Sequence, residues 1–197
     1  ELLAERRHDP AEGERPGHQP QLLALCAQAL EEAGVTWGDV TRIGAGVGPG
    51  TFTGLRIGVA TARALAQGLG AEVAAVSTLE ALARGAGEGR VAAVLDARRG
   101  EAFVAVWDGD RRELGPEVWR PEALARLCGE PLRAVGDGAV RFRAVLEAAG
   151  ATVPADDSDL HRVGARALCR LAATAPVVDR DALVPEYVRA PDAVPRR

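Results

Sequence analysis

The segment at residues 48–58, with the sequence GPGTFTGLRIG, combines glycine, proline and threonine between a predicted strand and a predicted helix. Its glycines allow positive φ and close approach of the backbone, and Pro49 stiffens the turn. Such a turn presents free N–H groups at the positive end of a helix dipole, which favours an anion such as phosphate. The candidate phosphate-facing residues are Gly48, Gly50, Thr51 and Thr53. The alternative interpretation is a tight turn whose threonine caps the helix and whose glycines serve packing alone.

Two other phosphate-binding motifs are excluded by the sequence. Gly44 and Gly46 begin a G-x-G-x-x-G pattern, but Pro49 occupies the third glycine position, so a dinucleotide site is not predicted. All 24 basic residues are arginine. A chain without lysine has neither the lysine of a P-loop nor a lysine that forms a Schiff base. Two large classes of enzyme are thereby excluded.

Candidate metal ligands and catalytic groups are few. The three histidines, His8, His18 and His161, have no second histidine or cysteine at metal-ligand spacing. Asp96 and Glu101 stand at the ends of two predicted strands, where they fit turn chemistry and solvation better than catalysis. No serine or cysteine occupies a G-x-S-x-G elbow. The sequence therefore predicts no catalytic residue, no metal and no other cofactor.

Composition and charge indicate a globular protein that does not bind nucleic acid by itself. Hydrophobic residues make up 47% of the 197 residues, and no apolar run approaches the ~18 residues of a membrane span. The net charge is −4 and the arginines are spread along the chain, so any RNA is expected to be held chiefly by a partner. Cys26, Cys128 and Cys169 lack C-x-x-C spacing, which is typical of buried thiols in a reducing, cytoplasmic compartment.

The elements that position the 48–58 segment follow from hydrophobic periodicity. The apolar stripe of residues 18–33 ends at Gly34 and predicts a helix. A second helix at residues 54–69 is apolar nearly all round, and its glycines and alanines at four-residue spacing leave one face almost without side chains. Burial of this face within the protein and contact with a second chain are both compatible with the pattern. The remaining predicted elements of the first half are strands at residues 41–47 and 72–76 and a helix at 77–84.

The second half begins after a glycine-rich linker at residues 85–89, and we expect lobes at residues 1–86 and 90–197. Its predicted elements are a hairpin of strands 90–96 and 101–108, a strand at 117–120, a helix at 121–128, a strand at 132–135, helices at 139–149 and 161–173, and an irregular tail after 176. The first half has the same order of elements without an opening hairpin, unless residues 2–7 form one strand. We therefore expect a duplicated fold from which roughly 15 N-terminal residues were lost or omitted. The alternative is that both halves merely share α/β alternation.

Five segments together resemble one protein family. The GPGTFTGLRIG segment is similar to the G-P-G-S-F-T-G-[LV]-R-[IV]-G signature of the TsaB family, also called YeaZ. His18 with residues 21–23 (QLL) is similar to the family's H-x-x-x-L-L helix start. The other three matches are residues 77–83 (STLEALA), 96–101 (DARRGE) and 185–189 (PEYVR).

The resemblance implies an α/β fold of the actin/Hsp70 (ASKHA) type, with two duplicated lobes of mixed sheets and flanking helices. It also implies an accessory role in threonylcarbamoylation of the adenosine beside the tRNA anticodon. Family members pair with a catalytic paralogue, TsaD, whose H-x-x-x-H metal pair this chain lacks, and with the ATPase TsaE. The family's opening I-D-T-[AS] hairpin, which faces the phosphates in this fold, does not occur before Glu1, so no nucleotide cofactor is expected.

The resemblance further implies that the two helices at residues 18–33 and 54–69 form a bundle with a homodimer partner or, in competition, with TsaD. The expected interface residues are Leu22, Cys26, Ala29, Arg56, Gly58, Ala62 and Ala66. An independent small-molecule kinase or peptidase of the same fold is the alternative function. The missing phosphate hairpin argues against a kinase, and the missing nucleophile elbow and metal pair argue against a peptidase. A purely homodimeric scaffold is a third possibility.

Overall fold

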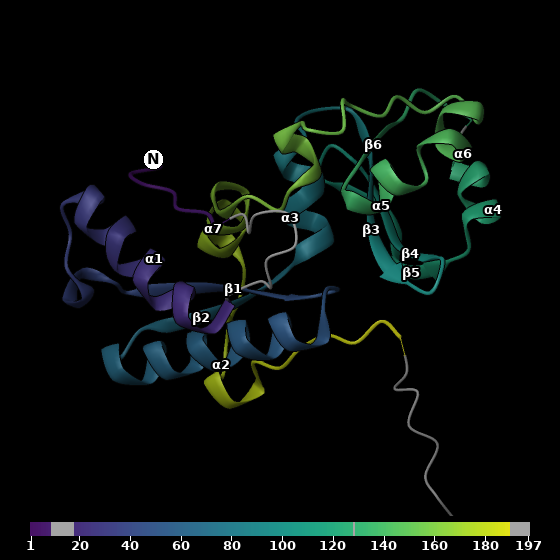
Figure 1. Ribbon diagram of the computed structural model, residues 1–197. Coiled ribbons are helices and arrows are strands. Elements are labelled where there is room, and N and C mark those ends of the chain that lie inside the picture. Colours follow the sequence, from purple (N-terminus) through teal and green to yellow (C-terminus); the bar gives the residue numbers. More distant parts are fainter. Residues whose placement is uncertain (9–17, 128, 190–197) are drawn as a thin grey trace, which may run out of the picture. The chain divides into compact units, whose positions relative to one another are not determined.

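The structure is a computed structural model that describes residues 1–8, 18–127 and 129–189. The chain divides into two units (Figure 1). Unit 1 comprises Glu1–Val47, Thr51–Val76 and Gly164–Val184, and unit 2 comprises Gly48–Gly50, Ser77–Val163 and the segment from Pro185. These units do not coincide with the expected lobes at 1–86 and 90–197. The helix after residue 77 packs in unit 2, and residues 164–184 return to unit 1.

Unit 1 contains a three-stranded sheet with strand order β1-β2-β7. Its main elements are α1 (His18–Ala33), β1 (Arg42–Gly48), α2 (Phe52–Leu69), β2 (Glu72–Ser77), α7 (Ala165–Thr174) and β7 (Val177–Val178). The predicted helices and strands of the first half are thus confirmed within two residues at each end. The predicted irregular tail is wrong in part, because β7 pairs antiparallel with β2 and a short 3-10 helix, η4 (Arg180–Ala182), follows it. Residues 2–7 form no strand.

Close packing of small residues joins α7 to β1. A Cβ atom on Gly44 would lie 2.4 Å from the Cβ of Ala172, so only glycine permits this separation. The Arg42 guanidinium donates hydrogen bonds to the carbonyl oxygens of Ala172 and Ala173, at 3.0 and 2.8 Å. These carbonyls lie in the last turn of α7 and have no partner within the helix. Arg42 therefore caps α7 and fixes it to the sheet.

Unit 2 contains a four-stranded sheet with strand order β5-β4-β3-β6. Strands β3 (Arg90–Arg98), β4 (Glu101–Asp108) and β5 (Arg111–Trp119) form an antiparallel meander, and β6 (Arg133–Val135) pairs parallel with β3. The predicted first hairpin is confirmed. The third strand is longer than the predicted 117–120, because β4 and β5 pair from Asp108 and Arg111 onward.

Helices cover both faces of this sheet (Figure 1). On one face, Ala92, Val94 and Val104 pack against Leu124 and Leu146 from two of the helices. The opposite face carries Val91, Ala93 and Trp107, which pack against Leu79 and Leu82 of α3. Burial on both sides explains why β3 reads as an almost continuous apolar run. The covering helices are α3 (Thr78–Gly85), α4 (Pro121–Leu124), α5 (Asp137–Arg141) and α6 (Arg143–Ala148).

Three predicted helices of the second half differ from the observed ones. The helix expected at 121–128 is α4 followed by the 3-10 turn η2 (Ala125–Leu127). The helix expected at 139–149 divides into α5 and α6 at Phe142, whose φ of −106° and ψ of 22° interrupt the regular turn. The helix expected at 161–173 is α7, which begins at Ala165 after the 3-10 turn η3 (Asp159–His161). Apolar spacing indicated these segments but not the breaks within them.

The backbone of Gly136 lies very close to that of β3, and this proximity leads to a stability prediction. Its φ is +111°, and a Cβ atom there would lie 2.2 Å from the carbonyl oxygen of Val94. We expect Gly136→Ala to lower the free energy of unfolding by about 2 kcal/mol or more, from strain and overlap together. The matched control is Gly150→Ala, at φ +95° with open space around the position. Urea unfolding measures both variants, and equal losses would contradict the importance of the close approach.

Candidate functional site

The loop before α2 is built around its glycine, proline and threonine residues. The Thr78 hydroxyl donates a hydrogen bond to the carbonyl oxygen of the buried Pro49. The Thr51 hydroxyl accepts the backbone N–H of Gly54 at 3.3 Å and is the N-cap of α2. A Cβ atom on Gly54 would lie 2.7 Å from the Thr51 hydroxyl oxygen. The cap therefore requires glycine at 54, and this explains part of the GPGTFTG sequence by packing.

The four predicted phosphate-facing residues differ in accessibility. Gly48 is buried, whereas Gly50, Thr51 and Thr53 are exposed. Because Gly48 and Gly50 cluster with unit 2 and the two threonines with unit 1, each pair is placed only within its own unit. A phosphate-facing role for these residues stays a prediction.

Helix α1 presents an apolar surface that the described part of unit 1 covers only in part. From residue 21 to its end, α1 contains no fully buried residue. Leu22, Cys26 and Ala29, three of the expected interface residues, are half-buried, and the neighbouring Leu23 is 51% exposed. A helix of a globular protein ordinarily buries its apolar stripe. The apolar side of α1 is therefore available for a further contact.

Helix α2 of unit 1 also carries exposed residues. The Arg56 guanidinium lies 3.8 Å from the centre of the Phe52 ring, a cation–π contact, and Phe52 is 56% exposed. A Cβ atom on Gly58 would meet no described atom within 4 Å, so the fold of the described chain does not itself require glycine there. We call the following residues the α1–α2 surface: Leu22, Leu23, Cys26, Ala29, Phe52, Arg56 and Gly58.

Ala62 and Ala66 correct the expected interface. Both belong to the core of unit 1, with exposed fractions of 6% and 3%, where they pack with Val59 and Val73. The helical repeat places Leu55, Val59, Ala62 and Ala66 on one stripe that faces the sheet. These two alanines are small because α2 lies close to β1 and β2, and they are not available to a second chain.

Burial raises the pKa of the Cys26 thiol above its usual value. The pKa of Cys169 is also raised, chiefly by burial and then by the charge of Glu5. Both cysteines are free thiols, but Cys26 is only half-buried and Cys169 is exposed, so the prediction of a buried thiol is wrong for Cys169. Cys128 lies outside the described residues.

Asp96 has the predicted turn chemistry, whereas Glu101 pairs with an arginine that is distant in the chain. An Oδ1 atom of Asp96 accepts the backbone N–H of Arg98 at 2.9 Å, and Oδ2 pairs with Arg141 at 2.7 Å. Glu101 forms an ion pair with Arg189. The sequence indicated neither arginine as a partner, although Arg189 ends the PEYVR segment and that motif was a usable signal.

His161 is a structural residue of unit 2. Its Nδ1 accepts the backbone N–H of Gly136 at 3.1 Å, so the ring proton is on Nε2, which donates to the carbonyl oxygen of Pro154 at 3.2 Å. Both ring nitrogens are thus used in backbone contacts. Among the residues that the structure describes, no group of three histidine, cysteine or acidic side chains could hold a metal ion. The described helices also include none that is long and apolar enough to cross a membrane.

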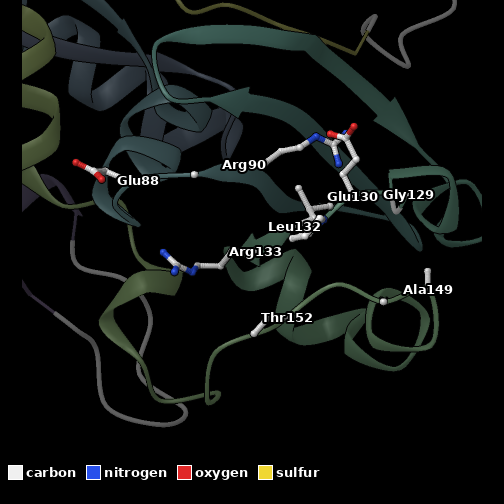
Figure 2. A pocket seen from close by; sticks show the side chains of 11 residues that line it. Glu88, Arg90, Gly129, Glu130, Leu132, Arg133, Ala149 and Thr152 are labelled. Atoms are coloured by element: carbon white, nitrogen blue, oxygen red, sulfur yellow. The ribbon is translucent and has the colours of Figure 1, made fainter.

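An open cavity of about 620 Å³ lies in unit 2 at the start of β3 and β6 (Figure 2). Arg90 and Arg133 line it, and Figure 2 shows their side chains directed away from each other. Arg90 binds Glu113 and the carbonyl oxygen of Leu127, while Arg133 binds the carbonyl oxygen of Ala86. The two guanidinium groups therefore support the fold and do not converge on a single ligand.

Comparison with known proteins identifies the fold and then the family. Residues 10–137 match the family model described as TsaD, tRNA N6-adenosine threonylcarbamoyltransferase. The solved structure of YeaZ from Pseudomonas aeruginosa is 31% identical with a TM-score of 0.74, over 88% of this chain and 86% of that chain. A second Pseudomonas aeruginosa structure, of an uncharacterized protein with similarity to peptidase YeaZ, is 29% identical with a TM-score of 0.73, over 88% and 85%. The protein thus has an actin-like α/β fold.

Two sequence relatives complete the comparison. The tRNA threonylcarbamoyladenosine biosynthesis protein TsaB of Escherichia coli is 36% identical over 127 residues, which cover 57% of this chain and 54% of the relative. The matched region therefore spans about half the length of this relative. An uncharacterized protein of Mycobacterium tuberculosis is 36% identical over 96% of this chain and 86% of its own length. The chain belongs to the TsaB (YeaZ) family.

The placement of the two alanines of α2 generates a prediction that separates core from interface. Ala62→Leu or Ala66→Leu adds bulk inside unit 1, so we expect a loss of about 1–3 kcal/mol in unfolding free energy. Exposed Ala60 of the same helix is the matched control, and Ala60→Leu should leave the melting temperature nearly unchanged. Calorimetry measures all three variants. Weakened self-association of the leucine variants at an unchanged melting temperature would return these positions to the interface.

Proposed function

We propose that this protein is a non-catalytic accessory subunit in the threonylcarbamoylation of the adenosine next to the tRNA anticodon, and that it acts by pairing with the catalytic paralogue TsaD. The half-exposed apolar α1–α2 surface is the observation that carries the proposal. The names of the relatives supply the pathway, because TsaB of Escherichia coli is named for threonylcarbamoyladenosine biosynthesis and the matching family model for the transferase.

The chemistry of the α1–α2 surface fits a protein partner better than a small ligand. Leu22, Leu23 and Ala29 of α1 supply apolar area, and α2 contributes the stacked Arg56 and Phe52, a guanidinium on an aromatic ring. Aromatic and arginine side chains are enriched among the residues that dominate binding energy at protein interfaces. Gly58 adds a position where a partner backbone can approach closely. A paralogue of the same fold can present a similar pair of helices to it.

Homodimerisation is proposed to use the same surface and therefore to compete with TsaD. An isologous dimer places the same patch of both subunits in one interface, and a paralogue of the same fold can replace one of them. TsaE is proposed to join through the assembled complex, and tRNA to be held chiefly by the partner and not by this chain alone. Because its substrate is tRNA, the proposed process also implies a cytoplasmic location.

Leu23 provides the direct test of the proposal. We expect the purified protein to co-elute with the TsaD of its organism and to support tRNA modification only when both are present. Leu23→Glu places a charge in an apolar interface and should weaken this association at least about tenfold, with an unchanged melting temperature. Leu3→Glu alters another exposed leucine of unit 1, outside both helices, and should have no effect. Unchanged association of Leu23→Glu, measured by calorimetric titration, would contradict a role for the α1–α2 surface.

Cys26 provides an independent footprint of the same surface. Because its pKa is raised, less thiolate is present at neutral pH, so iodoacetamide should modify it slowly and faster as the pH rises. Added TsaD should slow this modification further by covering α1. Cys169 is the internal control, since its pKa is also raised and α7 is outside the proposed interface. Mass spectrometry follows each cysteine separately, and equal protection of both would indicate a general stabilisation instead of local contact.

A further inference from the structure

The turn between β3 and β4 holds two adjacent arginines in a conformation that arginine disfavours. Arg98 and Arg99 have φ values of +63° and +57°, and Gly100 follows at +77°. Arg98 pairs with Glu101, so Arg99 and Gly100 form a two-residue hairpin turn with positive φ at both positions. Asparagine, aspartate and glycine are the residues that favour such positions. The arginines are therefore not explained by the needs of the turn itself.

Contacts from three parts of unit 2 fix this turn. Ala97 is an extra residue in β3, because Asp96 pairs with Ala102 while Arg98 already pairs with Glu101. A bulge leaves its extra residue out of the strand pairing, and Arg189 donates a hydrogen bond to the carbonyl oxygen of Ala97 at 3.1 Å. Asp96 accepts the Arg98 N–H, and its own N–H donates to Asp137 at 2.9 Å. A disfavoured backbone held by so many contacts is characteristic of functional positions.

The ion pairs of Asp96 place its carboxylate inward and two guanidinium groups outward. The Asp96 side chain is 8% exposed, whereas the side chains of its partners Arg98 and Arg141 are 73% and 47% exposed. Glu101 and Arg189 form a second ion pair, in which the two side chains are exposed to similar fractions, 29% and 25%. Arg99 is also exposed. Arg98 and Arg99 thus present two adjacent exposed arginine side chains at the end of the hairpin.

We propose that Arg98 and Arg99 contact a backbone phosphate of the tRNA in the assembled complex; this inference rests on the proposed function. Guanidinium groups bind phosphate oxygens in a bidentate manner. The backbone N–H of Arg98 is already bonded to Asp96, so the arginine side chains, and not a nest of main-chain amides, face the ligand. Side-chain contacts of this kind position a nucleic-acid backbone without reading its sequence. Two arginines are too few to bind RNA alone, so the contact strengthens a complex held mainly by the partner.

Replacement of both arginines by asparagine tests this function separately from folding. Arg98→Asn with Arg99→Asn removes both charges but suits positive φ, so the melting temperature should stay equal or rise. The tRNA affinity of the complex with TsaD should fall about tenfold near 0.15 M salt, and the slope of log affinity against log salt should decrease by about 1 to 2. The matched control is Arg111→Gln with Arg112→Gln, which removes two adjacent exposed arginines at the next hairpin of unit 2. It should change neither quantity.

Other results of these binding measurements would overturn the proposal or assign the turn to a different ligand. Unchanged tRNA affinity of the asparagine variant, or an equal loss in the control, would overturn the proposal. A loss of affinity for an ATP analogue, or for the partner proteins without RNA, at unchanged tRNA affinity would assign the turn to a nucleotide phosphate or to a protein instead. A wild-type chain that fails to support tRNA modification contradicts the proposed function. A wild-type chain that supports it, with an asparagine variant that binds tRNA equally well, contradicts this inference alone.

Discussion

The close approach of the β6–α5 turn to β3 is the constraint on which much of unit 2 depends. Cβ atoms on Gly136 and Gly138 would lie 2.2 and 2.7 Å from backbone atoms of Val94 and Leu95, so side chains are excluded at both positions. This proximity allows Asp137 to accept the backbone N–H of Asp96, and α5 carries Arg141 to the Asp96 carboxylate. The backbone N–H of Gly136 donates a hydrogen bond to His161 Nδ1, and this contact also holds the turn in place.

Small residues have a similar role in unit 1. Gly44 against Ala172 joins α7 to β1, and Ala62 with Ala66 brings α2 close to the sheet. Close backbone packing of this kind leaves little tolerance for added volume. Helix α2 therefore contains small residues of two kinds. Ala62 and Ala66 are small because of the core, whereas the described chain places no atom within 4 Å of a Cβ on Gly58, which we propose contacts a partner.

The two proposed contacts use different physical chemistry on different units. The α1–α2 surface of unit 1 offers apolar area. Its removal from water by a protein partner lowers the free energy of the complex. The β3–β4 turn of unit 2 offers exposed guanidinium groups next to the shielded carboxylate of Asp96. Guanidinium groups of this kind suit a phosphate. In the proposed accessory role the protein needs no catalytic residue of its own. Its proposed contribution is to hold a partner and to add a contact to the partner's substrate.

The sequence by itself determined the positions of most helices and strands, because apolar periodicity and helix caps such as Thr51 are local signals. It also determined the excluded chemistry, since a chain without lysine cannot form a P-loop site whatever its fold. The family signature at residues 48–58 is a continuous segment, so it too could be recognised without the structure. Only the tertiary structure decided that Ala62 and Ala66 face the core, that β7 and α7 return to unit 1, and that Arg141 and Arg189 neutralise Asp96 and Glu101. These facts depend on pairs of residues distant in the chain, and neither the hydrophobic pattern nor a motif specifies which of its possible neighbours a side chain will meet.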